Sequence, residues 1–158
     1  MRSAAAALLF ATLGLTLAFA PRWIRVPGLA AAVIGAAIVS VSGFPVAMQG
    51  TAFLGCWASL IVTAACVHLR GGPGPCAVLA LSGNAGLWAG AVIATTGPPS
   101  DLLRALPGAL IILPAAIIHR HAPIALKIAS SWLIAVAMLA ASLNFLPVTP
   151  GYQPDHLE

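Results

Sequence analysis

Residues 76–96 read CAVLALSGNAGLWAGAVIATT, a stretch without a single charged side chain. A helix needs about 20 predominantly apolar residues to cross the hydrocarbon core of a bilayer. Asn84 is the most polar side chain in this stretch, and it stands about 12 Å from the stretch's start at 1.5 Å per helical residue. The stretch therefore predicts a membrane-spanning helix with one amide near its middle.

The composition of the whole chain agrees with a membrane location. The chain has 158 residues, of which 61% are hydrophobic and 6% are charged, whereas an ordinary soluble domain is about 25% charged. This excludes a soluble single domain and a disordered chain. The net charge of +4 comes from single, scattered basic residues, so we expect no nucleic-acid partner.

Further apolar stretches flank the first one on both sides, and prolines stand at or near most of their ends. Together the sequence predicts an all-α polytopic transmembrane helical bundle, with about six short-looped antiparallel spans forming three hairpins. Residues 1–147 form a single transmembrane helical domain, and residues 148–158 form a short extramembrane C-terminal tail. The expected spans are 4–20, 27–44, 51–68, 76–96, 102–118 and 122–146.

The fifth expected span differs from the others because it contains two prolines, Pro107 and Pro114, in its interior. A proline lacks the N–H that bonds the carbonyl four residues earlier. We therefore expect a kinked or locally broken helix, with Arg104 near its start. Broken helices expose backbone dipoles that bind solutes in some transporters, so Arg104, Pro107 and Pro114 join Asn84 as candidate solute-binding residues.

The first expected span resembles a secretory signal peptide, because Arg2 precedes an apolar run that ends in Ala18-Phe19-Ala20. Pro21 would then be the first mature residue, a position that signal peptidase disfavours. We expect the first helix to be retained.

Basic residues gather in the odd-numbered connections of this topology. Arg22, Arg25, Arg70, Arg120 and Lys127 fall on one side, against two arginines and all three acids on the other. Because short cytoplasmic loops are enriched in Lys and Arg, both termini are predicted on the non-cytoplasmic side. The high Ala, Gly and Pro content is typical of a high-GC bacterium, so we expect a multi-pass protein of the bacterial inner membrane.

Small residues recur every four positions in the fourth span, at Ser82, Gly86, Gly90 and Ala94. Such a face lets helix backbones approach closely, which predicts that the fourth span is the central packing element. A second stripe, Ala32, Ala36 and Ser40, lies on the second span. Either stripe could face the same chain or another copy. Asn84 lies off the first stripe and serves either an interhelical hydrogen bond or a solute.

Cysteines and histidines gather at the predicted cytoplasmic ends. Imidazole and thiolate are ligands for zinc, copper or nickel, and the HxH in a turn could chelate if that turn is extended. However, the spacings match no established metal signature, so no cofactor is expected and a metal or haem is the alternative. The residues in question are Cys66, His68, Cys76, His119 and His121.

The absence of reactive side chains decides the expected class of function. No Asp or Glu lies within a span, although coupled transporters commonly place one there, and no nucleophile–base pair or phosphate loop is recognisable. We expect a non-enzymatic membrane protein that packs in the lipid bilayer as an accessory subunit of a membrane complex or as a self-associating bundle (homo-oligomer). The alternative is a small permease or channel subunit for a neutral or anionic solute.

Overall fold

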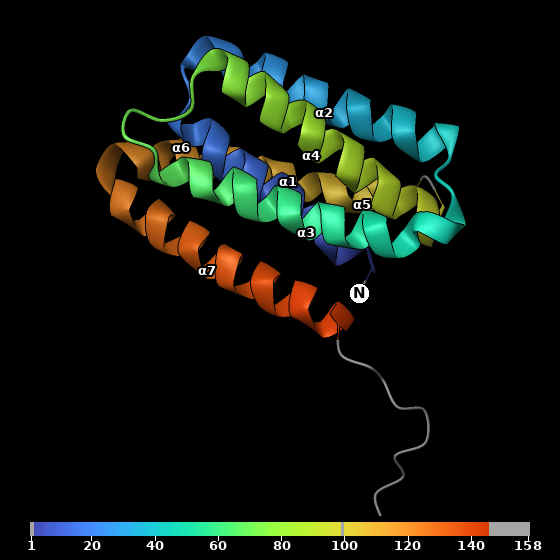
Figure 1. Cartoon of the computed structure of the whole chain (residues 1–158). Coiled ribbons are helices and arrows are strands. Elements are labelled where there is room, and N and C mark those ends of the chain that lie inside the picture. The colour runs from blue at the N-terminus through green and yellow to red at the C-terminus, as the bar shows by residue number, and fades with distance from the viewer. Residues whose placement is uncertain (1, 99, 146–158) are drawn as a thin grey trace, which may run out of the picture.

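The structure is a computed structural model that describes residues 2–98 and 100–145, and this part of the chain contains helices and no strand. The helices lie side by side in one bundle (Figure 1). This confirms the predicted all-helical class. The α-helices are α1 (Arg2–Phe19), α2 (Arg22–Ser42), α3 (Gln49–Ala65), α4 (Pro75–Thr96), α5 (Asp101–Ala105), α6 (Ile112–His121) and α7 (Pro123–Ser142). Short 3-10 segments are η1 (Val46–Met48), η2 (Cys66–His68), η3 (Leu106–Ile111) and η4 (Leu143–Phe145).

Five helices of the described chain are long and apolar enough to cross a membrane, each with 20 to 22 residues. The sixth, Ala4–Phe19, is apolar but shorter. The ends of α3–η2, α4 and α7–η4 differ by one or two residues from the predicted spans, while the predicted tail, 148–158, lies outside the described residues. The five long helices are Arg22–Ser42, Gln49–His68, Pro75–Thr96, Asp101–His121 and Pro123–Ser142.

The most enclosed helix is α1, a place that the prediction gave to the fourth span, while α4 is the most buried of the five longer helices and packs on α1, α2 and α3. Side chains on every face of α1 are buried, among them Phe10, Leu13 and Leu17 at 1% exposure or less. Figure 1 shows α1 in the middle of the bundle, with α2 and α4 on one side and α7 on the other. Because its hydroxyls bond to carbonyls, as Thr16 does to Thr63 O at 2.8 Å, α1 presents no unpaired polar face.

The predicted three hairpins are found only in part: α3 and α4 pack on each other as consecutive helices, whereas α1 and α2 scarcely touch. The most extensive contact joins α2 to α4, which run parallel: Ala32 packs on Gly86, and Ala36 packs on Gly90 four residues further along each helix. In Figure 1 these two helices lie together along their length, with α3 beyond α4. Small residues on both helices allow this approach, so α2 packs on α4 although the two are not consecutive in the chain.

The second helix begins at Arg22, five residues before the predicted start, and Pro27 lies inside it. Arg25 lies in its first turn, and the Arg25 Nε and Nη2 donate to Ala20 O at 3.0 Å and to Ala18 O at 2.9 Å. An arginine near a helix C-terminus satisfies carbonyls that have no partner within the helix. Arg25, in the first turn of α2, thus satisfies carbonyls at the C-terminal end of α1. Pro27 lies near the start of α2 and costs that helix only one backbone hydrogen bond.

The predicted break in the fifth span is confirmed. The chain passes from α5 through the 3-10 segment η3 into α6. Pro107 is the second residue of η3 and Pro114 the third of α6, so neither offers an N–H to the carbonyl four residues before it. The break lies against α1: a Cβ on Gly108 would meet the Ala7 carbonyl, and one on Gly14 would lie 3.0 Å from the Ile112 nitrogen.

Candidate functional site

The amide of Asn84 is hydrogen-bonded at both ends. Its Nδ2 donates to Ser59 Oγ of α3 at 2.7 Å, and its Oδ1 accepts from Trp88 Nε1, one turn further along α4, at 3.1 Å. Trp88 in turn lies against Gly55 of α3, where a Cβ would collide with its ring. The geometry therefore gives Asn84 the structural role of joining α3 to α4.

Neither Ser59 nor Trp88 was predicted as a partner of Asn84. The signal that was available is the four-residue spacing of Gly55 and Ser59, a small-xxx-small face on the third apolar stretch. That spacing marks a helix face that a bulky neighbour can cover. It does not say which helix supplies that neighbour.

Replacing Asn84 by alanine is expected to lower the free energy of unfolding by about 1–2 kcal/mol, since interhelical hydrogen bonds in membrane proteins contribute roughly 0.6 and at most about 1.7 kcal/mol each. The variant loses the bond to Ser59 and leaves the Trp88 N–H unpaired. SDS titration of the protein in detergent micelles, followed by tryptophan fluorescence, measures the change. Ser42→Ala is the matched control, because Ser42 is exposed and bonds only to carbonyls of its own helix; equal effects of the two substitutions would contradict the assigned role.

The predicted small-residue stripe meets α2 of the same chain. A Cβ on Gly86 would collide with the Ala32 carbonyl oxygen, and one on Gly90 would lie 2.7 Å from the Ala36 carbonyl oxygen. Ser82 is buried at the same interface beside Gly28, whereas Ala94 is half-buried. The two stripes therefore pack on each other, which answers the question that the sequence left open.

The other predicted solute-binding residues do not join Asn84 in one site. Arg104 is exposed and donates to Asp101 Oδ1 at 3.0 Å, one turn away on α5. Pro107 and Pro114 belong to the broken helix that packs on α1, while Asn84 is bonded to α3. Asn84, Arg104 and the two prolines therefore lie in three separate places in the described chain and form no common binding site.

The cysteines and histidines are dispersed as well. His68 Nε2 lies 3.1 Å from Ser130 Oγ on α7, and the His119 ring packs edge-on against Phe19 with centroids 4.3 Å apart. Cys66 is half-buried and Cys76 exposed. Over residues 2–98 and 100–145 no three His, Cys, Asp or Glu side chains come together as a metal site.

The predicted chelating turn was wrong in its geometry. His119 and His121 lie in the last turn of α6, where side chains two positions apart point in different directions. His121 is exposed, while His119 faces inward. An HxH pair chelates only from an extended backbone, which this segment does not adopt.

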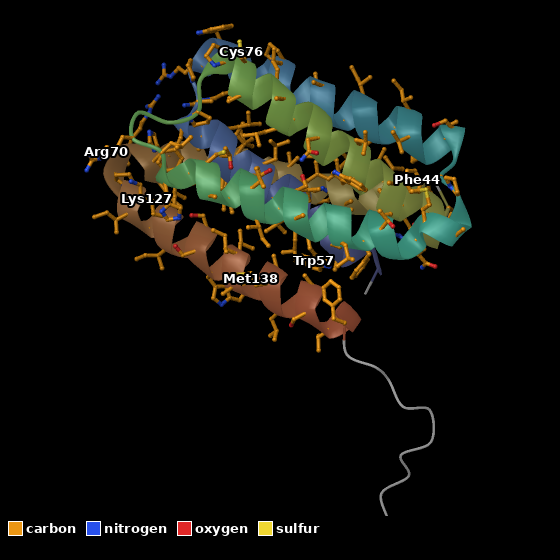
Figure 2. All side chains as sticks on the ribbon, in the orientation of Figure 1. Phe44, Trp57, Arg70, Cys76, Lys127 and Met138 are labelled. Atoms are coloured by element: carbon orange, nitrogen blue, oxygen red, sulfur yellow. The ribbon has the colours of Figure 1, made fainter. Side chains whose placement is uncertain are left out.

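A pocket of about 300 Å³ opens at the end of the bundle where α1, α3 and α6 finish and where α4 and α7 begin. We call it the basic-end pocket. Figure 2 shows Arg70 and Lys127 at this end, with Phe44 at the opposite one. His119 Nδ1 is buried there without a hydrogen-bond partner. The residues that define the pocket are Phe19, Arg70, Gly72, His119, Pro123 and Lys127.

Sequence reasoning did not assemble this pocket, because its wall comes from four segments that are far apart in the chain. Gly72 shows how closely they meet: its φ is +76°, a conformation that favours glycine, and a Cβ there would collide with the Phe19 carbonyl. The available signal was the recurrence of an arginine followed by a proline in the connections at this end.

Comparison with protein-family profiles, with curated proteins and with solved structures finds no match to this chain. The function is therefore inferred from the geometry alone.

Proposed function

We propose that this chain is a multi-pass protein of a bacterial inner membrane, with α1 and the five longer helices all crossing the bilayer. The support is the separation of charge in the bundle. Arg22, Arg25, Arg70, Arg120 and Lys127 all lie at the end that holds the basic-end pocket, while Asp101 and Arg104 lie at the other. By the preference of basic residues for the cytoplasmic side, the basic end faces the cytoplasm and both termini face away from it.

This orientation predicts one-sided labelling of a native thiol. Cys76 is exposed at the basic end, whereas Cys56 is buried and Cys66 is half-buried. With Cys56 and Cys66 replaced by alanine, a membrane-impermeant maleimide is expected to label Cys76 in inside-out vesicles and not in intact spheroplasts. Mass spectrometry of the protein measures the labelled fraction.

Ser100→Cys in a chain without other cysteines is the matched control for this labelling, because Ser100 is exposed at the opposite end. It is expected to react from the spheroplast surface only. Labelling of Cys76 from the outer surface would reverse the proposed orientation, and labelling of both positions from one side would contradict the crossing of the bilayer.

The role of the protein, in this proposal, is non-enzymatic: it is an accessory subunit of a membrane complex or a self-associating bundle. The observation that carries the proposal is that buried and half-buried polar side chains hold helices together. Asn84 joins α3 to α4, Thr16 joins α1 to α3, and Arg25 joins α2 to the end of α1. The one described carboxylate, Asp101, is paired with Arg104 at a bundle end, so the described spans offer no acid for proton or cation coupling.

Affinity purification from membranes in a mild detergent, followed by native mass spectrometry, tests this role. Other polypeptides in fixed stoichiometry would identify an accessory subunit, and copies of this chain alone would identify a self-associating bundle. A lone monomer that carries a solute across liposome membranes would overturn the proposal.

A small permease or channel subunit for a neutral or anionic solute is the second candidate, and the broken helix α5–η3–α6 favours it. Discontinuous helices bind solutes through freed backbone groups. In this chain, however, η3 is packed against α1 at Gly108 and Gly14. Solute flux into proteoliposomes that is saturable and altered by Arg104→Ala would support the permease, and flux equal to that of protein-free liposomes would exclude it for the solutes tested.

A further inference from the structure

The basic-end pocket contains more positive charge than the surrounding protein neutralises. Arg70 and Lys127 both line it. Across residues 2–98 and 100–145 the single carboxylate is Asp101, which is bound to Arg104 at the opposite end of the bundle. The two cations of the pocket therefore have no counter-charge within the described chain.

His119 adds an unsatisfied polar atom to the same pocket. Its ring is held edge-on against Phe19, and its Nδ1 is buried without a hydrogen-bond partner. Buried polar groups in native proteins are nearly always hydrogen-bonded to protein, water or a ligand. His119 thus places an imidazole ring with an unpaired nitrogen in the wall of the pocket.

The start of α7 contributes a further positive potential. Pro123, the first residue of this 20-residue helix, lines the pocket one turn before Lys127. The N-terminal end of a helix carries a partial positive charge and favours anions. Two cationic side chains, the His119 ring and the N-terminus of α7 thus line one cavity.

We propose that the basic-end pocket binds a phosphate-type oxyanion. Arg70 presents a planar guanidinium that matches the oxygens of a phosphate, Lys127 adds a point charge, and the His119 ring in the pocket wall offers an N–H. The volume of about 300 Å³ accommodates such a group with bound water, since a single water needs only about 10–15 Å³ by this measure. The group belongs to a soluble phosphate or to a phospholipid headgroup at the membrane surface, two sources of one chemistry.

This binding site goes beyond the proposed packing role and does not depend on it. The pocket is formed within one chain, so an anion binds whether the protein is a subunit, a self-associating bundle or a permease. The pull-down described above and the binding experiment below therefore fail independently.

Binding is measured on the full chain after purification and delipidation in detergent. Inorganic phosphate is titrated by isothermal calorimetry, and phosphatidic acid in mixed micelles is followed by native mass spectrometry. Saturable binding of at least one probe is expected. Lys127→Gln, Arg70→Gln and His119→Phe should each weaken it roughly tenfold, the equivalent of losing one charge-assisted hydrogen bond.

His119→Phe removes the ring nitrogens and keeps the aromatic contact with Phe19, so it remains informative if a charge variant folds poorly. Arg22→Gln, which changes an exposed arginine at the same end but outside the pocket wall, is the matched control and should bind normally. Binding of inorganic phosphate assigns a soluble ligand, while binding of phosphatidic acid alone assigns a headgroup. The proposal is overturned if neither probe saturates, if the pocket variants bind as the wild type does, or if Arg22→Gln loses as much affinity as they do.

Discussion

Replacing Gly86 by alanine is expected to destabilise the bundle by about 1–3 kcal/mol, the usual cost of overpacking a close contact. The added Cβ would collide with the Ala32 carbonyl oxygen of α2. It would also lie 3.1 Å from the carbonyl carbon and from the Cα of Ala32. A backbone atom has no rotamer through which to move aside, so α2 and α4 must separate. This separation also disturbs the next contact along the pair, between Gly90 and Ala36.

Gly83→Ala on the same helix is the matched control. Gly83 is exposed, and a Cβ there meets no atom within 4 Å. Alanine is a better helix former than glycine by about 0.5–1 kcal/mol, so this variant should be as stable as the wild type or more so. SDS titration in micelles measures both variants. Equal stabilities would mean that α2 and α4 do not touch at Gly86.

The helical class and the small-residue contact were predictable because both depend on local patterns. Apolar stretches of spanning length predict helices wherever the chain is inserted. The stripe at Gly86 and Gly90 indicated a close contact, and a second, weaker stripe was visible at Ala32 and Ala36. What remained open was whether the two stripes meet each other, because spacing within a helix carries no information about its neighbours.

The order of the helices was harder to predict for a physical reason. In a soluble bundle an apolar face shows which side of a helix is buried, but here lipid-facing and buried positions are both apolar. Leu13 of α1 is buried while Ile38 of α2 is 62% exposed, and both stand in uniformly apolar stretches. The central place of α1 therefore depended on contacts that hydropathy does not encode.

Part of the candidate site was likewise predictable from the sequence, and part of it was not. That Asn84 requires a partner follows from the cost of an unpaired amide in hydrocarbon, and the prolines of the fifth stretch predicted its break. The basic-end pocket, by contrast, needs Arg70, His119 and Lys127 to be close in space, which only the packing of four segments provides. The HxH prediction failed because α6 continues through His121, and the sequence there contains no helix-stopping residue before Pro123.

Replacing Gly108 by alanine is the second substitution with a large expected effect. In η3 this glycine lies against α1, where a Cβ would collide with the Ala7 carbonyl oxygen and lie 3.3 Å from the Ala11 nitrogen. Both obstacles are backbone atoms of the most enclosed helix. We expect a loss of about 1–3 kcal/mol of stability, which SDS titration of the micellar protein measures. Gly50→Ala, at an exposed position of α3 with open space around it, should have no such effect.

The Gly108 variant also discriminates between the two proposed functions. If η3 is a fixed packing segment, crowding it against α1 lowers stability and changes no transport, because none occurs. If η3 is part of a moving gate, a Cβ that forces it away from α1 alters the balance of open and closed states, so flux through proteoliposomes must change. Unchanged stability together with altered flux would contradict the packing role of η3, and a large loss of stability with background flux would support it.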